Sequence, residues 1–354
     1  MISLDNAIAD FMSEKRIHRW ANLPTHHLTV GLIRKSKRTI WTGRQSMEAD
    51  VKKSIYEIGS ITKTLTGLLL AIGEQHGMWS RSDRLSAFVP EWSSNSFANQ
   101  TTLLELVTHT AGLPDVPGNF RATITDRLNP YAKYDDARLT EAVLSESPKK
   151  NSKHRYSNYG FGLLGWLLAR RLGTSLNEAL AGLIFQPLGM ADSGTGTSRQ
   201  TAGQLLPVFN SKGKPMPHWD FLDTLGGAGA VRSTVDDMLT YLDAHLTRVD
   251  PPLGPAIAEC LQEHYAIMPS RGIGIGFGWM RFREKDGTIT HWHNGGTYGS
   301  SSFITFNREK EIGLVILSNH GSTIWSQLAP LIGIQVMSVD HLASMLTKKL
   351  FMES

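Results

Sequence analysis

A serine and a lysine three residues apart are the first pair in the sequence that could carry out chemistry. Ser60 and Lys63 belong to the run Ser-Ile-Thr-Lys, and on a helix this spacing brings the lysine amine beside the serine hydroxyl. A serine hydroxyl is a weak nucleophile, and a neighbouring group that takes its proton supplies the missing activation. The pair predicts covalent catalysis with Ser60 as the nucleophile. The alternative is an ordinary helix cap followed by a solvated lysine.

The same four-residue pattern also occurs at 147–150 and at 211–214, so context has to decide among the three. Both of those segments lie in polar stretches with Pro, Lys or Gly, which are typical of loops. Ser60 instead follows a short strand-like segment and opens the apolar run 61–77. We therefore expect a buried helix from Ser60 to about Gly77, with the reactive serine at its start.

Tyr156 and Asn158 form the only Tyr-x-Asn among the eight tyrosines, just ahead of a second apolar helix. A tyrosine near a lysine can be pushed towards phenolate, because a positive charge favours the charged form of the phenol. Tyr156 is therefore predicted to handle protons together with Lys63. The amide of Asn158 can both donate to and accept from a substrate amide. The alternative is a turn followed by a helix cap.

The third motif, His293-Asn294-Gly295-Gly296, is the only His-x-Gly among the thirteen histidines. Glycines let a substrate lie against a strand, and a backbone N–H there could face an oxyanion together with the N–H of Ser60. The alternative is a plain turn between two strands. His291 and His293 share one face of the strand, but no third ligand is placed by spacing, so we expect no metal site.

The elements that must position these residues change in type along the chain. A β-hairpin is predicted at 28–43, and the last third reads as antiparallel strands with short turns. Between them the sequence shows helices and no convincing strand pattern. The predicted helices are 101–108, 136–145, 159–172, 175–185, 233–246 and a closing helix 323–350, and the predicted late strands are 276–283, 288–293, 301–307 and 312–318. The fold class is therefore α+β.

This arrangement predicts an antiparallel sheet flanked by N- and C-terminal helices. The sheet and its helices would form a discontinuous α/β domain from residues 1–78 and 226–354. Residues 79–225 would form a mainly helical insert domain.

Composition and charge limit the function classes. The 354 residues include 41% hydrophobic and 19% charged residues, as in a globular protein, and 36 Lys and Arg stand against 32 Asp and Glu. No run of five basic residues occurs, so nucleic acid is not an expected partner. The single cysteine, Cys260, is interpreted as a buried core residue.

The first residues lack the pattern of a signal peptide, and no apolar run is long enough to cross a membrane. We expect a soluble chain that is cytoplasmic, or exported with its signal already removed. The sequence does not predict the oligomeric state.

The ordered motifs together resemble the serine β-lactamase and penicillin-binding-protein superfamily, in particular the branch of class C β-lactamases, DD-peptidases and β-lactamase-like esterases. The resemblance runs from about Val30 to Asn319. It extends to the segments LVTHTAGLP (106–114), FQPLGMADSG (185–194), GGAGAVRSTVDDM (226–238) and GGTYGSSSFITFN (295–307). It implies the β-lactamase/transpeptidase-like fold and needs neither a metal nor an organic cofactor.

The resemblance also implies roles for single residues. Ser60 would be acylated, Lys63 would be its proton partner, and Tyr156 would protonate the leaving group and help to activate the deacylating water. Asn158 would hold the substrate amide. Backbone N–H groups of Ser60 and Gly296 would form the oxyanion hole, and His293 and Gly295 would belong to the strand that binds the substrate.

The third motif departs from the β-lactamase pattern, which has Lys-Thr-Gly where this chain has His293-Asn294-Gly295. A lysine supplies a permanent charge for a substrate carboxylate, whereas a histidine is mostly neutral at pH 7. We therefore expect a serine hydrolase for a small ester, amide or peptide, of the esterase or D-amino-acid peptidase or amidase type. The alternatives are a β-lactamase or DD-carboxypeptidase of class C type, and a penicillin-binding sensor without turnover.

Overall fold

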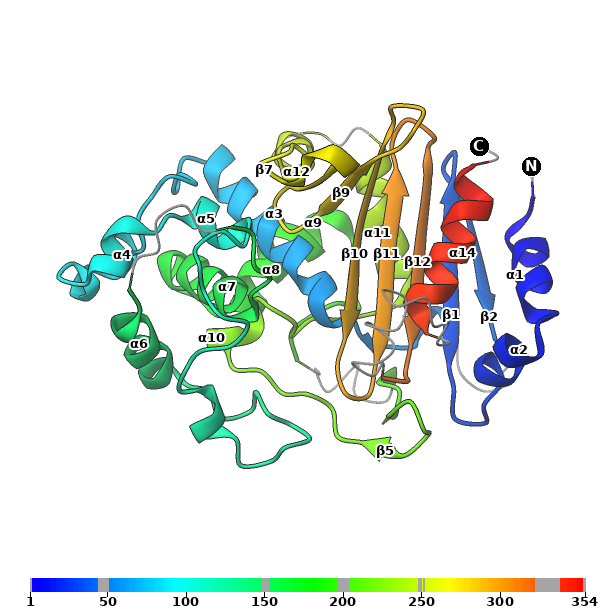
Figure 1. The fold of residues 1–354 in the computed structure, drawn as a ribbon, viewed down its shortest axis with the longest axis horizontal. Coiled ribbons are helices and arrows are strands. Elements are labelled where there is room, and N and C mark those ends of the chain that lie inside the picture. The colour runs from blue at the N-terminus through cyan, green and yellow to red at the C-terminus, as the bar shows by residue number, and fades with distance from the viewer. Residues whose placement is uncertain are drawn as a thin grey trace.

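An eight-stranded antiparallel sheet is the framework of the computed structural model, which describes residues 2–43, 51–147, 153–196, 204–247, 250, 252–321 and 338–352. The strand order is β2-β1-β12-β11-β10-β9-β8-β7 (Figure 1). The strands are β1 (Leu28–Arg34), β2 (Lys37–Thr42), β7 (Tyr265–Met268), β8 (Ile273–Ile275), β9 (Met280–Arg283), β10 (Ile289–Gly296), β11 (Ser301–Asn307) and β12 (Ile312–Ser318). Because β1 pairs with β12, segments from both ends of the chain are neighbours in the sheet.

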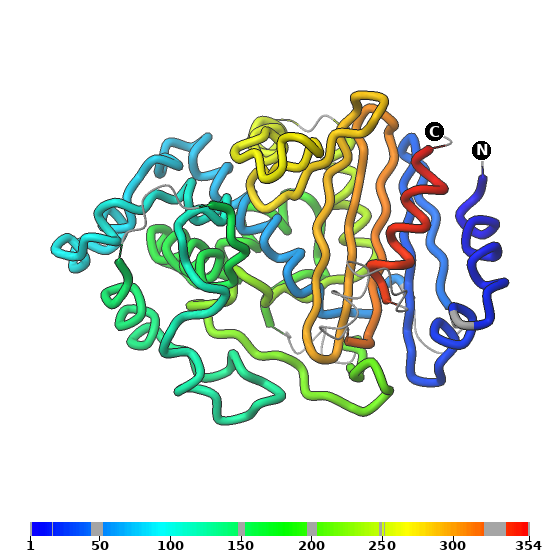
Figure 2. Tube along the Cα trace, in the orientation of Figure 1, coloured from blue at the N-terminus to red at the C-terminus, as the bar shows by residue number. Residues whose placement is uncertain are grey.

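Alternation along the strands gives the sheet two buried faces. Leu314 and Ile316 of β12 pack with helices α1 (Leu4–Met12) and α14 (Val339–Phe351). Val315 and Leu317 point to the opposite face, into a core shared with α11 (Val235–Leu246). The two terminal helices therefore cover one face of the sheet, and both ends of the tube lie beside them (Figure 2).

Helix α3 (Thr62–Gln75) lies between the sheet and the remaining helices, and most of its residues are buried, as the apolar run predicted (Figure 1). It packs against α7 (Asn158–Leu172) and α12 (Leu253–Cys260). The outer helices on this side are α4 (Ser96–Gln100), α5 (Leu103–Val107), α6 (Asp136–Ser145), α8 (Leu176–Leu180) and α9 (Gln186–Leu188). Helix α2 (Lys15–Ala21) lies beside α1 (Figure 1). Helix α3 is thus the shared core element of the sheet side and the helical side.

A close crossing fixes α7 against α10 (Asp223–Gly226). A Cβ on Gly227 would lie 2.5 Å from the carbonyl oxygen of Phe161 and 3.0 Å from the Cα of Gly165. Side chains larger than hydrogen would therefore push the two backbones apart. The crossing places the chain directly after α10, including Ala228, beside α3 and α7.

The sequence predictions hold for the hairpin, the central helix, the antiparallel sheet and the late strands. The N-terminal helices were expected without stated ranges, whereas β7 and β8 were not predicted. The predicted helix at 175–185 is α8 followed by a π-helical turn, Ala181–Phe185. The predicted strand 276–283 begins only at Met280, because Gly278 has a φ of +75° in a turn that packs on the backbone of Lys63. The closing helix is seen as Val339–Phe351, and residues 322–337 lie outside the described part.

The middle segment is not wholly helical. It contains the two-residue strands β4 (Val208–Phe209) and β5 (Pro215–Met216), which pair with each other, and β3 (Tyr56–Glu57) pairs with β6 (Arg232–Ser233) outside the main sheet. Such short pairs leave no alternating pattern to detect. The division into domains at 78/79 and 225/226 stays a prediction. Among the described residues, no helix is both long and apolar enough to cross a membrane.

Candidate active site

Ser60 lies at the start of α3, in a single turn of 3-10 helix, Gly59–Ile61, that runs directly into it. Its N–H belongs to the first turn, where amide groups have no acceptor within the helix. Gly59 has a φ of +49°, and a Cβ there would overlap the backbone nitrogen of Gly296. The glycine therefore lets the strand that carries Gly296 come close to the serine.

Lys63 is fully buried one helical turn after Ser60. Its Nζ lies 3.0 Å from Ser60 Oγ, 2.7 Å from Asn158 Oδ1 and 2.7 Å from the carbonyl oxygen of Ala228. Burial lowers the pKa of Lys63 from 10.5 to about 7, and the charge of Asp115 opposes this shift. A substantial fraction of Lys63 is therefore a neutral amine near pH 7, which is the form that accepts a proton.

The three partners of Lys63 differ in what they can accept and donate. The oxygens of Asn158 and Ala228 only accept, so a neutral amine uses its two hydrogens on them. Its lone pair is then left for the hydroxyl of Ser60, which both donates and accepts. This pattern orients the amine as a base towards the serine.

Asp115, which the sequence analysis did not single out, fixes the orientation of the Asn158 amide. Nδ2 of Asn158 donates to Asp115 Oδ1 at 2.8 Å, so Oδ1 of Asn158 has to face Lys63. The segment of Asp115 is held at the start of α7, because its carbonyl oxygen accepts from the N–H of Tyr159 at 2.8 Å. One hydrogen of Asn158 Nδ2 is left for the predicted role at a substrate amide.

Tyr156 approaches from the other side, and its ring centroid lies 4.8 Å from Lys63 Nζ. The whole side chain is 39% exposed, yet its hydroxyl end is desolvated. This burial raises the pKa of Tyr156, while a hydrogen bond with Ser60 opposes the shift. The direction of this pKa shift is opposite to the expected shift towards phenolate, because burial disfavours the charged phenol. Tyr156 keeps its proton, and Lys63 is the group that loses one readily.

Ser157, between Tyr156 and Asn158, is a helix cap, which was the alternative interpretation of this motif. Ser157 is the N-cap of α7, where its Oγ accepts from the N–H of Gly160 at 2.9 Å and donates to the carbonyl oxygen of Pro114 at 2.6 Å. The cap therefore holds the segment in place while the residues on either side of it turn towards Lys63. Capping and placement of reactive groups occur in the same turn.

His109 supports Tyr156 from behind. Its ring centroid lies 4.7 Å from that of Tyr156 and 4.8 Å from that of Phe161, and its Nδ1 accepts from the N–H of Ser157 at 3.1 Å. Burial and the charge of Lys63 hold the pKa of His109 well below its usual range. It acts as a neutral packing and hydrogen-bonding group. The only sequence signal was its place in the segment 106–114.

The glycines of the third motif form the opposite wall. A Cβ on Gly295 would overlap the carbonyl oxygen of Ile58 and lie 3.0 Å from the backbone nitrogen of Ser60. Thr297 N donates to Ser300 O at 2.9 Å, so by the alternation of antiparallel pairs the N–H of Gly296 points away from β11. Strand β9 pairs with β10 only as far as Trp292, so this N–H faces the cavity side.

The two residues before these glycines lie in β10, as predicted, and their side chains turn away from Ser60. His293 is buried with its ring centroid 6.4 Å from that of Tyr156, and burial and the charge of Lys63 lower its pKa to about 3. It is absent from the described residues that line the cavity. Nδ2 of Asn294 donates to Asp340 of α14 at 2.9 Å, so its side chain turns to the other face of the sheet. The motif therefore brings no positive charge to the cavity.

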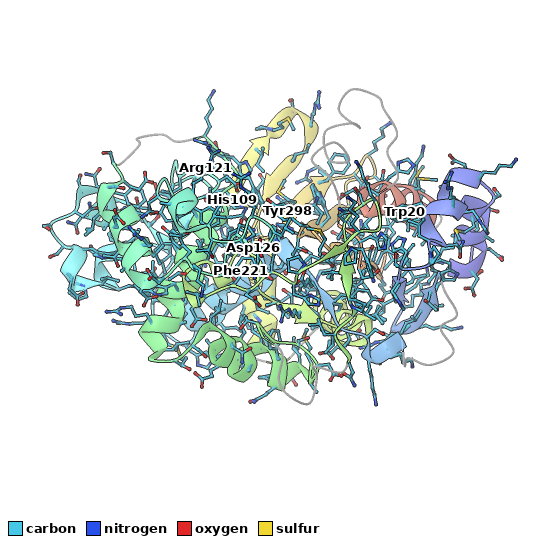
Figure 3. The ribbon with its side chains drawn as sticks, turned by 90° about the horizontal axis from the view of Figure 1, so that it is seen from below. Trp20, His109, Arg121, Asp126, Phe221 and Tyr298 are labelled. Atoms are coloured by element: carbon cyan, nitrogen blue, oxygen red, sulfur yellow. The ribbon has the colours of Figure 1, made fainter. Side chains whose placement is uncertain are left out.

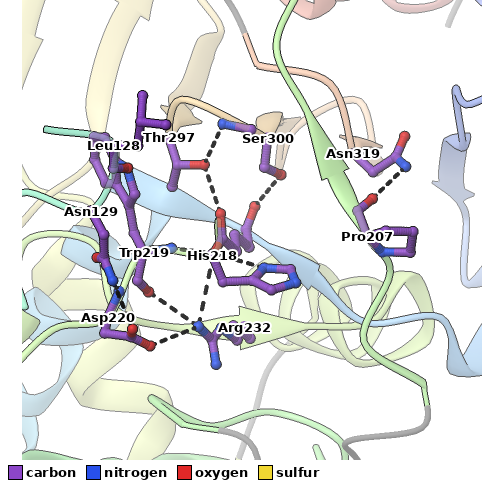
Figure 4. A network of polar contacts seen from close by, with 12 residues as sticks. Leu128, Asn129, Pro207, His218, Trp219, Asp220, Arg232, Thr297, Ser300 and Asn319 are labelled. Atoms are coloured by element: carbon purple, nitrogen blue, oxygen red, sulfur yellow. Dashed lines mark hydrogen bonds and ion pairs between the residues drawn. The ribbon is translucent and has the colours of Figure 1, made fainter. Parts of the chain in front are cut away.

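Glu57 anchors the segment that follows the glycines. Its partners Thr297, Trp219 and Arg232 are labelled in Figure 4. Its buried carboxylate accepts from Thr297 Oγ1 at 2.6 Å and from the N–H of Trp219 at 2.8 Å. Arg232 lies 3.8 Å from the same carboxylate and donates to the carbonyl oxygen of Trp219 at 3.1 Å. The network joins the end of the β10–β11 hairpin to the segment at 218–221.

Ser60 opens into a cavity of about 630 Å³. Four aromatic residues form one side of it, which we call the aromatic wall: Tyr131, Trp219, Phe221 and Tyr298. Figure 3 shows Phe221, Tyr298 and His109 in the central part of the molecule, away from Trp20 beside the terminal helices. The described lining residues include the carboxylate of Asp115 and no lysine or arginine. The cavity therefore combines an aromatic surface, backbone amides and one negative charge.

The remaining candidates from the sequence lie elsewhere. Ser211 and Lys214 belong to an exposed turn between β4 and β5, and residues 148–150 lie outside the described part. Cys260 is buried in α12, and burial raises the pKa of its thiol. The ring of His291 stacks on Phe306 at 5.1 Å, and the described residues contain no group of three or more His, Cys, Asp or Glu arranged to hold a metal ion.

Comparisons with known proteins agree with this architecture. A sequence profile of the family described as Beta-lactamase matches residues 30–332. A β-lactamase of Lysobacter lactamgenus is 22% identical over 75% of this chain and 74% of its own, and penicillin-binding protein 4 of Amycolatopsis lactamdurans is 24% identical over 76% and 73%. A crystal structure of a class C β-lactamase from Rhodobacter sphaeroides is 21% identical, with a TM-score of 0.74 over 92% of this chain and 97% of that one.

Proposed function

The chain belongs to the β-lactamase family and is a serine hydrolase of that family, and we propose that it hydrolyses esters or amides. We infer that its substrates carry no carboxylate next to the scissile bond. Ser60 is the nucleophile of this proposal. The observation that carries the substrate class is the absence of any lysine or arginine among the described residues that line the cavity.

Acylation follows from the hydrogen bonds around Ser60. Ser60 hydrogen-bonds with Tyr156, and its Oγ lies 3.0 Å from Lys63 Nζ. When Lys63 is a neutral amine, the Ser60 hydroxyl is the donor to it. When Ser60 Oγ attacks the carbonyl carbon of the substrate, its proton passes to Lys63, and the carbonyl oxygen becomes an oxyanion. We assign the stabilisation of that charge to the N–H groups of Ser60 and Gly296. The assignment is supported by the close approach of the two backbones: a Cβ on Gly59 would lie 2.4 Å from the nitrogen of Gly296, and one on Gly295 would lie 3.0 Å from the nitrogen of Ser60.

The leaving group then departs with a proton from Tyr156, whose raised pKa keeps that proton available. The ammonium of Lys63 returns its proton to Tyr156, which restores the phenol. In deacylation a water molecule attacks the acyl carbon, its proton follows the same path, and Ser60 is released with its hydroxyl restored. Acylation releases the alcohol or amine, and deacylation consumes one water and releases the acid.

The residues that replace the Lys-Thr-Gly pattern support the substrate class. A substrate carboxylate would meet Asp115 in the cavity and would find His293 buried, neutral and behind Tyr156. Like charges at close range disfavour binding, and no side chain of the motif offers a compensating cation. Uncharged or cationic acyl compounds avoid this repulsion.

A substrate panel tests the proposal. We expect wild-type protein to hydrolyse p-nitrophenyl acetate and butyrate with a larger kcat/KM than nitrocefin or a D-alanyl-D-alanine peptide, both of which carry a carboxylate. Ser60→Ala should lose all of these activities. Nitrocefin turnover near the diffusional ceiling of about 10⁸ M⁻¹ s⁻¹ would contradict the substrate class and favour a β-lactamase. Stoichiometric acylation without turnover would favour a penicillin-binding sensor.

A further inference from the structure

The aromatic wall and Asp115 together have the chemistry of a site for a positively charged nitrogen. Tyr131 stacks on Phe221 with ring centroids 4.5 Å apart, and Tyr298 stands nearly perpendicular to Trp219 at 4.8 Å and 79°. Perpendicular rings turn their faces in different directions, so a group that lies against the wall meets ring faces as well as edges. Ring faces carry the negative part of the aromatic quadrupole and attract cations.

The wall is held in position by contacts outside the cavity. Trp219 Nε1 donates to the carbonyl oxygen of Leu128 at 3.0 Å, and Asn129 and Asp220 exchange two hydrogen bonds of 2.8 and 2.9 Å. Tyr298 follows Thr297, which Glu57 binds, and its side chain is 45% exposed at the cavity. The rings are therefore fixed before any substrate arrives, so little ordering cost is added on binding.

Asp115 adds the charge that distinguishes a cation from a neutral apolar group. Both of its side-chain bonds to Asn158 end on Oδ1, which leaves Oδ2 outside them. Asp115 lines the same cavity as Ser60 and the four rings of the wall, and it holds Asn158, whose Oδ1 contacts Lys63. A neutral group bound here would remove water from this carboxylate without compensation, whereas a cation would pair with it.

We propose that the cavity selects substrates that carry an ammonium or trimethylammonium group on the part that lies against Tyr131, Trp219, Phe221 and Tyr298, with Asp115 as the counter-ion. This inference rests on the proposed function and specifies its substrate class: esters or amides with a cationic nitrogen near the scissile bond. A site with a carboxylate-binding lysine selects a negatively charged substrate, whereas this cavity would select a positively charged one.

A matched pair of ligands tests the charge alone. Choline and 3,3-dimethylbutan-1-ol have nearly the same shape and differ by the charged nitrogen. Binding of each to Ser60→Ala is measured by ligand-observed NMR titration, which needs no turnover and so separates this inference from the proposed function. We expect choline to bind about tenfold more tightly, the scale of a partly desolvated cation–π contact.

Variants assign the preference to its residues. Asp115→Asn keeps an oxygen for Asn158 and should reduce the preference for choline to less than about threefold. Glu91→Gln, which changes an exposed carboxylate outside the cavity lining, should keep the preference. Trp219→Leu should weaken choline more than its neutral counterpart. If Asp115→Asn does not fold, added salt should weaken choline alone in the Ser60→Ala protein. Equal binding of the two ligands, or a preference that survives Asp115→Asn, would overturn the inference.

Discussion

Replacing Lys63 by methionine should change how the stability of the protein depends on pH. In the folded protein the pKa of Lys63 is lowered from 10.5 to about 7 by burial. The unfolded chain therefore binds one more proton than the folded protein between these two values. Stability rises with pH wherever the unfolded state binds more protons, so Lys63 destabilises the fold fully below pH 7 and progressively less up to about pH 10.5.

The size of the effect follows from the same shift. Where the folded amine is neutral and the unfolded amine is protonated, stability changes by about 1.4 kcal/mol per pH unit. Between pH 7 and pH 9 the free energy of unfolding of the wild type should therefore rise by about 2 kcal/mol relative to that of Lys63→Met. The hydrogen bonds lost in the variant do not titrate in this window and cancel in the comparison, as does His293 with its pKa of about 3.

Urea unfolding at pH 7, 8 and 9 measures this difference. Lys212→Met removes an exposed lysine in the turn after β4 and serves as the control, which should follow the wild type. In parallel, kcat/KM of the wild type for a neutral ester should rise with pH through about 7, as Lys63 loses its proton. Parallel stability curves for wild type and Lys63→Met would refute the reasoning, because they would mean that Lys63 keeps an ordinary pKa and stays an ammonium at neutral pH.

Two further predictions concern the groups around Ser60. Tyr156→Phe and Lys63→Ala should each lower kcat by about 10²-fold or more, the contribution of a positioned acid or base, while circular dichroism and melting curves show that both variants stay folded at the assay temperature. The double variant should be little worse than the poorer single one, because both act in one proton path, and fully multiplicative losses would argue for separate steps. Gly295→Ala should also lower kcat by about 10²-fold, because its Cβ would overlap Ile58 and displace β10 from Ser60. Gly182→Ala, whose Cβ enters open space, is the control, and a normal rate for Gly295→Ala would contradict the assigned oxyanion site.

The sequence predicted those parts of the site that depend on local geometry. Ser60 and Lys63 are one helical turn apart, so their contact follows from the helix itself. The turn before α7 carried both Tyr156 and Asn158 on a recognisable cap. The glycine pair at 295–296 could be recognised because glycine weakens a strand and often marks a close approach of a ligand or another backbone.

Contacts between distant segments could not be predicted in this way. Asp115 and Asn158 are 43 residues apart in the sequence. Ala228 contacts Lys63 through its backbone carbonyl oxygen, so its residue type does not indicate the contact. The direction of the pKa shift of Tyr156 depends on how deeply its hydroxyl end is buried, which spacing alone does not give. His293 and Asn294 were correctly placed on the strand, but the face that each side chain occupies was decided by the packing of Tyr156 and α14.

The fold was predictable where strands are long enough to show alternation. β11 and β12 have seven residues each and follow the predicted ranges closely. β4, β5 and β8 have only two or three residues, which is too short for an alternating pattern. They depend on tertiary contacts that the local sequence does not predict. The closing helix was expected at 323–350, and within the described residues it is Val339–Phe351, whose buried residues recur with helical spacing.

Covalent labelling of Ser60 tests the central claim most directly. The protein is incubated with a fluorophosphonate and analysed by intact-mass spectrometry and peptide mapping. A single adduct on the peptide that contains Ser60, absent from Ser60→Ala, is the predicted result. Pretreatment with a neutral p-nitrophenyl ester should slow the labelling, because the acyl-enzyme occupies the same oxygen. An adduct on Ser147 or Ser211, or labelling that persists in Ser60→Ala, would contradict the account.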